Sequence, residues 1–154
     1  FQDQDAARSL LTRVQGLEPS VWAVIAPVDV SGTVYFRVMV GLAGAPEALA
    51  DVVQAVTRGI GRDVEGWILR EVAVTLCLAG PGGSADVAAE TARLASQGIA
   101  AFLREEPSPS GETLFRVCSG AFSDAEEATF FEDRLRAQGW APEVWMLPSP
   151  TGRT

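Results

Sequence analysis

Histidine and lysine are absent from the 154-residue sequence, and cysteine occurs only twice. Without histidine the chain has no Ser–His or Cys–His nucleophile pair and no histidine-ligated zinc or iron site. Two cysteines alone cannot build a structural zinc site. We therefore expect a protein that is not an enzyme and that needs no metal or cofactor.

Positive charge and long apolar runs are also scarce. The net charge is −8 and the pI is near 4.5, which argues against nucleic acid or an acidic membrane surface as a partner. No apolar run approaches the roughly 18–20 residues of a membrane helix, so we expect no membrane contact from this segment. The first residue is not Met and no signal peptide is recognisable, which favours a segment excised from a longer protein.

One pattern recurs along the chain: an alternating strand, a short turn and an amphipathic helix. In its clearest copy, residues 114–119 alternate and Phe122 follows as an anchor. Ser123 and Glu126 predict a capping box at the start of the helix. The helix then carries an apolar stripe at helical spacing, formed by Ala128, Phe131 and Leu135.

Three further copies can be aligned on the anchor position. The four anchors lie about 40 residues apart, at Phe1, Ala43, Pro81 and Phe122. The copy that begins at Phe1 contains only the helix, so we expect its strand to lie upstream of the sequence. Short strands are predicted after the helices, at 21–28, 67–72, 99–103 and 144–147.

Turn-rich segments at 29–33 and 105–113 join the copies in pairs, as β-hairpins. Each pair makes a ferredoxin-like βαββαβ unit with both helices on one face of an antiparallel or mixed sheet. We predict an α+β protein with units at 1–71 and 72–150 and a tail at 151–154, the first unit lacking its opening strand. The first and third strands of each unit are expected to run parallel at the sheet centre. The alternative, one domain with a mostly parallel sheet, is disfavoured by the hairpins.

The repeated segments resemble the SPOR (sporulation-related repeat) family of bacterial envelope and cell-division proteins. The resemblance is carried by "FRVCSGAFSDAEEATFFEDRLRAQG" (115–139), by "FRVMVGLAGAPEALADVVQAV" (36–56), and more weakly by residues 75–94 and 1–14. It implies a peptidoglycan-binding module that favours glycan strands stripped of their stem peptides. It also implies a periplasmic or extracytoplasmic location, with a tether upstream.

The family binds on the exposed face of the sheet. Strand alternation places seven residues there, namely Arg116, Cys118, Thr75, Cys77, Arg37, Met39 and Tyr35. Arg can clamp the lactyl carboxylates of a glycan bidentately, and apolar side chains can cover its C–H surfaces. The alternative is that Arg37 and Arg116 are solvated residues on an open strand face, alone or paired with nearby carboxylates. Four tryptophans, which can stack on sugars, are assigned more readily to packing: Trp22, Trp67, Trp140 and Trp145.

Cys77 and Cys118 occupy equivalent positions on neighbouring central strands. Strands about 4.8 Å apart allow a disulfide, although two reduced thiols packed side by side remain the alternative. Rival functions also stay open. A degenerate SPOR pair could act as a protein–protein or dimerisation module, with itself or another envelope protein as partner. A ferredoxin-like regulatory domain that binds a small ligand is a third reading.

Overall fold

The computed structural model describes residues 1–17, 22–41, 46–60 and 71–147. It is an α+β protein, as predicted. In chain order its elements are α1 (Gln4–Leu17), β1 (Ala23–Val30), β2 (Thr33–Val40), α2 (Pro46–Ile60), β3 (Val74–Gly82), α3 (Ser84–Ser96), β4 (Phe102–Pro107), β5 (Thr113–Phe122), α4 (Ala125–Ala137) and β6 (Glu143–Met146). Residues 67–70 of one predicted strand and the predicted tail lie outside the described residues, and Glu71 and Val72 are in no strand.

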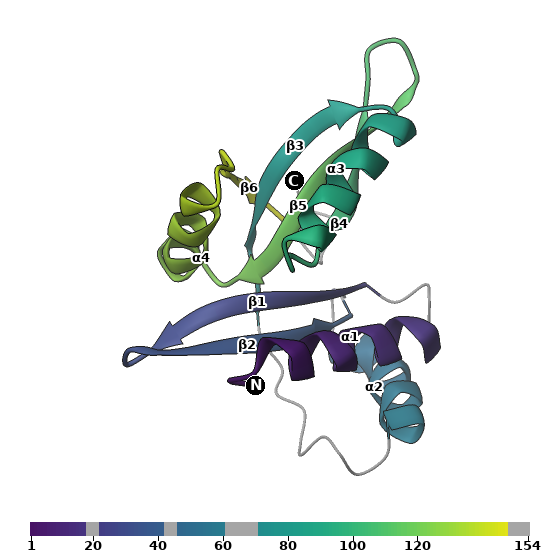
Figure 1. Cartoon of the computed structure of the whole chain (residues 1–154). Helices are drawn as coiled ribbons and strands as arrows, with labels where there is room; N and C mark the ends of the chain where they lie inside the picture. Colours follow the sequence, from purple (N-terminus) through teal and green to yellow (C-terminus); the bar gives the residue numbers. More distant parts are fainter. Residues whose placement is uncertain (18–21, 42–45, 61–70, 148–154) are drawn as a thin grey trace.

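Residues 71–147, here called the C-terminal half, form a four-stranded sheet in the order β4-β5-β3-β6. Helices α3 and α4 cover one face of it (Figure 1). This is the strand order of a ferredoxin-like unit. The prediction that the first and third strands run parallel is wrong, because β3 and β5 pair antiparallel. The crossover through helix α3 brings the chain back so that β4 runs in the same direction as β3. The β4–β5 hairpin then reverses the chain, and β5 therefore lies antiparallel to β3.

The core of the C-terminal half lies between this sheet and its helices. Leu76 and Val117 point into it from the two central strands, and Phe122 is fully buried. A β-bulge in β5 brings Phe122 to that side, since Leu76 pairs with Ser119 but Val74 pairs with Phe122. Gly120 supplies the bulge with its φ of +74°, a conformation that favours glycine. The predicted stripe of α4 is confirmed, with Ala128, Phe131 and Leu135 all buried.

The start of α4 differs from the predicted capping box by one residue. The N-cap is Asp124, whose carboxylate accepts a hydrogen bond from the Glu127 backbone N–H at 2.8 Å. Glu127 in turn accepts from the backbone N–H of Ser123 at 2.8 Å. The N-cap is therefore Asp124 rather than Ser123, and the return bond from the helix comes from Glu127 and reaches Ser123, the residue before the cap. Asp and Ser are about equally good caps, so the sequence pattern alone does not separate the two registers.

Residues 1–60, here called the N-terminal half, contain a two-stranded sheet, β1–β2, with α1 and α2 packed on one of its faces. Ser31 and Gly32 form the hairpin turn, both with positive φ, as the turn-rich segment predicts. Helix α1 buries one apolar stripe, formed by Ala7, Leu10, Leu11 and Val14.

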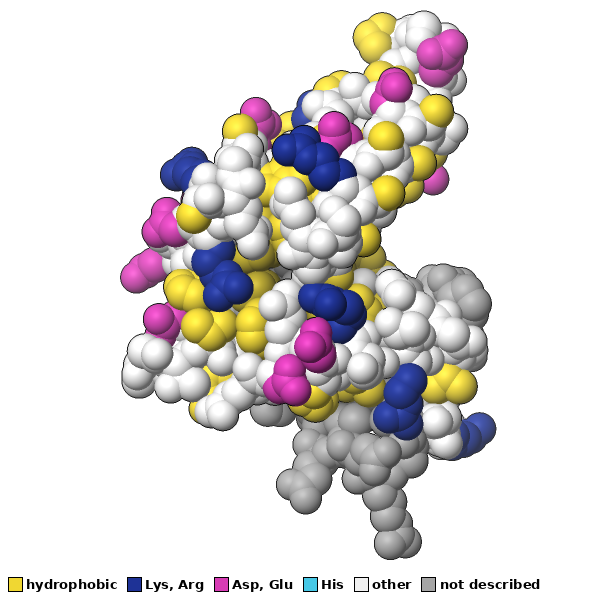
Figure 2. Space-filling model, viewed as in Figure 1, with side chains coloured by type: hydrophobic (Ala, Val, Ile, Leu, Met, Phe, Trp, Pro, Cys, Tyr) yellow, Lys and Arg dark blue, Asp and Glu magenta, His cyan; other side chains and the backbone are white. Residues whose placement is uncertain are grey.

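The second face of the β1–β2 sheet packs against the C-terminal half. Ala26 and Val28 of β1 join the same core cluster as Leu76 and Val117. In Figure 1 the hairpin lies crosswise to the larger sheet, at the end where β3 begins and β5 ends. Figure 2 shows yellow apolar side chains around this junction. The two halves therefore share a hydrophobic core.

Candidate functional site

The outer face of the C-terminal sheet is the face opposite α3 and α4. Residues that pair directly across antiparallel strands point to the same face. Arg104 pairs with Arg116, Thr75 pairs with Trp145, and Cys77 pairs with Cys118. Strand register thus brings Arg116, Cys118, Thr75 and Cys77, all proposed from the sequence, onto one surface.

Cys77 and Cys118 form a disulfide with an S–S distance of 2.02 Å and a Cα–Cα distance of 3.9 Å. The sequence had left this pair open between a bridge and two thiols. Because β3 and β5 are antiparallel, the cysteines face each other directly across the two central strands. The bridge ties together segments 41 residues apart in the sequence.

Three of the residues expected to be exposed are buried: Thr75 (0% exposed), Cys77 (4%) and Cys118 (0%). The Thr75 hydroxyl donates to the carbonyl of Gly120 at 2.7 Å. These side chains therefore form the floor of the outer face rather than its accessible surface.

A stack of one indole and two guanidinium groups lies above this floor. The Arg116 guanidinium carbon is 4.1 Å from the centre of the Trp145 ring, and that of Arg104 is 5.4 Å from it. Strand β3 lies between β5, which carries Arg116, and β6, which carries Trp145. The two side chains can meet only across β3, so the indole covers the floor. Contacts of this kind between Arg and Trp hold the ring and the cations in place.

Both arginines are also positioned by hydrogen bonds. Arg116 donates from Nε to Glu106 Oε2 at 2.5 Å and from Nη1 to the carbonyl of Gly80 at 3.3 Å. Arg104 donates from Nη1 to the carbonyl of Met146. The Trp145 Nε1–H donates to Glu143 at 3.2 Å. Each guanidinium has five N–H donors, so both arginines keep donors free for a ligand.

Sequence reasoning did not single out Arg104 or Glu106, and it assigned Trp145 to packing. The signal that could have found them is the hairpin register, because Arg104 stands directly opposite Arg116. That register requires the position of the turn, which the sequence placed only within 105–113. The structure has the turn at residues 108–112, between β4 and β5.

The site residues predicted for the N-terminal half lie against the C-terminal half. Tyr35 and Met39 pack on its core cluster. Arg37 donates from Nη1 to Glu127 Oε1 on α4 at 2.6 Å, with 27% and 21% of the two side chains exposed. The structure therefore does not bring Arg37 and Arg116 onto one continuous face.

Glu127 is the titratable group most affected by this contact. Burial by itself would raise its pKa. The hydrogen bond from the Ser123 backbone N–H, followed by the hydrogen bonds from Arg37 and the Ser123 hydroxyl, outweighs burial and lowers the pKa from 4.5 to about 2. Glu127 is therefore ionised at neutral pH and forms a charged link between the halves.

The described residues contain no group of three or more His, Cys, Asp or Glu side chains that could hold a metal ion. Within the same residues, no helix combines the length and the apolar character needed to span a membrane.

An antiparallel sheet with two helices on one face defines a ferredoxin-like α+β unit, and its other face carries the Arg–Trp stack. Residues 74–144 match the family model of the SPOR domain, and this segment belongs to that family. No curated protein and no solved structure matches the chain. SPOR domains are a binding family rather than a catalytic one. They bind peptidoglycan in cell-division proteins and occur in proteins of the cell envelope.

Proposed function

We propose that this chain is a non-catalytic module that binds denuded glycan strands of peptidoglycan through the outer face of its C-terminal sheet. The observation that carries the proposal is the Arg104–Trp145–Arg116 stack on a surface of a SPOR domain. A glycan without stem peptides presents lactyl carboxylates and sugar C–H surfaces. Arginine recognises the first, and a partly exposed indole covers the second.

The rigid floor supports the same proposal. Thr75, Cys77 and Cys118 lie under the stack and are fixed by a hydrogen bond and a disulfide. Side chains held by such a floor lose little conformational entropy when a ligand binds. In this account Arg116 is the residue that contacts the glycan carboxylate. Arg104 and Trp145 shape the surface beside it.

We further infer that residues 1–71 form a second SPOR-like unit beside the unit at 72–150. The element order α1-β1-β2-α2 parallels α3-β4-β5-α4, and both middle pairs of strands are hairpins. The main chain of Phe1 exchanges two hydrogen bonds with Phe36 of β2. In the C-terminal half, the residue equivalent to Phe36 is Phe115 of β5, and it pairs with Gly82 at the end of β3. Arg37, Tyr35 and Met39 would meet a glycan only if the two halves separated.

The test is co-sedimentation of the chain with purified sacculi, before and after amidase treatment that removes the stem peptides. We expect binding to rise after amidase treatment and to fall with added salt, as a contact between Arg and carboxylate requires. Failure to bind either preparation would exclude the glycan function. Equal binding to both would exclude the preference for denuded strands. The proposed setting is the periplasm, at sites of cell division.

Self-association is a second candidate, favoured by the exposed edge strand β6. Val144 and Met146 are 41% and 64% exposed there, and β6 is the last strand of its sheet. An apolar edge strand can pair with a second copy. Sedimentation velocity distinguishes this candidate, since a dimer that dissociates on Met146→Lys substitution would support it and a monomer at all concentrations would exclude it.

A further inference from the structure

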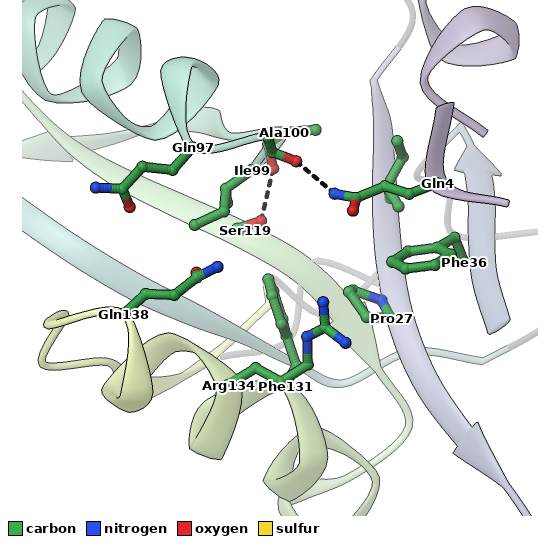
Figure 3. Close-up of a pocket in the computed structure, with 12 residues that line it drawn as sticks. Gln4, Pro27, Phe36, Gln97, Ile99, Ala100, Ser119, Phe131, Arg134 and Gln138 are labelled. Carbon is green, nitrogen blue, oxygen red and sulfur yellow. Dashed lines mark hydrogen bonds between the residues drawn. The ribbon is translucent and has the colours of Figure 1, made fainter. Parts of the chain in front are cut away.

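A small cleft opens between the two halves, on the side of the C-terminal sheet that carries the helices. Gln4 and Phe36 line it from the N-terminal half, and Ser119, Arg134 and Gln138 line it from the C-terminal half (Figure 3). Its volume is about 50 Å³. It lies on the opposite side of the sheet from the Arg–Trp stack, so it is a separate site.

Arg134 is the only charged side chain that lines the cleft, and it has no acidic partner among the described residues. Its guanidinium instead stands 5.9 Å from the centre of the Phe36 ring and 5.7 Å from that of Phe130. Arg37 and Arg116, by contrast, both have carboxylate partners. An Arg held against aromatic rings without a counter-ion, in a protein with a net charge of −8, is suited to binding an anion.

The other polar side chains that line the cleft differ in whether they have donors left for a ligand. Gln97 accepts the Trp140 indole N–H through Oε1 at 2.7 Å, which fixes its amide orientation and leaves its NH₂ group free to donate. Gln4 donates to the carbonyl of Gly98 at 2.8 Å. The Ser119 hydroxyl proton is already directed at the carbonyl of Ala100. Figure 3 shows the Gln138 amide and the Arg134 guanidinium both directed into the gap.

We propose that this cleft binds a carboxylate, specifically the C-terminal carboxylate of a peptide whose last residue is small. Arg134 would hold the two carboxylate oxygens, with the Gln138 amide beside it. Phe36 and Ile99 provide apolar walls for one methyl group. A volume of this size holds about three or four water molecules, enough for a carboxylate and a methyl but too small for a sugar ring.

The test uses N-acetyl-alanyl-alanine and the same dipeptide with a C-terminal carboxamide. Each is titrated into the full chain while amide and Arg side-chain resonances are followed by NMR. We expect saturable shifts at Gly98, Gln138 and the Arg134 Nε–H with the carboxylate form. The carboxamide should bind at least about tenfold more weakly, because it lacks the charge that strengthens the hydrogen bonds. Equal binding of the two forms, or no binding, would overturn the proposal.

Arg134→Gln should weaken binding of the dipeptide at least about tenfold. Arg136→Gln is the matched control, because Arg136 lies in the same last turn of α4 but pairs with Glu132 at the surface. Circular dichroism checks that both variants are folded, and Gln138→Leu provides an independent change in the cleft. Unchanged affinity in Arg134→Gln would show that the guanidinium is not the recognition group. Tighter binding of inorganic phosphate than of the dipeptide would also contradict the assignment.

Discussion

Arg37 on β2 and Glu127 on α4 are 90 residues apart in the sequence, yet their side chains meet at 2.6 Å. This ion pair joins the two halves beside the core cluster that they share. The pair lies on the face of the β1–β2 sheet that the family resemblance predicts to be exposed to ligand, and this face packs against the C-terminal half instead. The same arginine that was expected to meet a ligand meets a carboxylate of its own chain.

Glu127→Gln should lower the free energy of unfolding at pH 7 by about 1–3 kcal/mol. The folded-state pKa is lowered from 4.5 to about 2, so the stabilisation is complete above about pH 4.5 and is lost as the pH falls towards 2. Urea unfolding at several pH values measures this. The stability of the wild type should decrease over that range, and the variant should lack this component. Glu126→Gln, an exposed neighbour in the same turn, should change little.

Reduction of the Cys77–Cys118 disulfide should destabilise the chain by about 4 kcal/mol, from the entropy of a loop of 41 residues. Chemical denaturation with and without dithiothreitol measures the change. The double variant Cys77→Ala/Cys118→Ala should be as weak as the reduced wild type and should not respond to the reductant. A wild type that keeps its full stability under reduction would contradict the assigned bridge.

Gly120→Ala should destabilise the chain by roughly 2 kcal/mol or more. Its φ is +74°, and a Cβ there would lie 2.6 Å from the ring of the buried Phe122. Gly111→Ala is the matched control, since it has a φ of +84° but open space around it. Thermal unfolding of the two variants separates the steric clash from the cost of a positive φ. Equal losses in both would show that the bulge tolerates a side chain.

Much of the fold could be predicted from the repeat, because strand and helix periods are local properties. The apolar stripe of α4 follows directly from spacing. The burial of Phe122 does not, because strict alternation would place it on the outer face without the β-bulge at Gly120. The relative direction of β3 and β5 was predicted wrongly, although the predicted order of elements implies it. The helical crossover leaves β4 parallel to β3, and the β4–β5 hairpin then reverses the chain, so β5 is antiparallel to β3.

The candidate site was only partly predictable for a related reason. Alternation identifies the face of Arg116, but the indole that covers this face comes from β6, a different part of the chain. The burial of Cys118 also involves another strand, because Phe102 of β4 stands directly opposite it. The packing of Tyr35 and Met39 against the other half likewise depends on how two separate sheets meet, and no short sequence pattern encodes this.

The most direct test of the account is the affinity of single variants for amidase-treated sacculi, measured side by side. Arg116→Ala should lose about tenfold or more in affinity, because it removes the guanidinium that stacks on Trp145 at the outer face. Arg37→Ala should retain the affinity of the wild type, because Arg37 faces the other half of the chain. Full binding by Arg116→Ala, or loss of binding by a folded Arg37→Ala, would contradict the assignment of the glycan to the outer face.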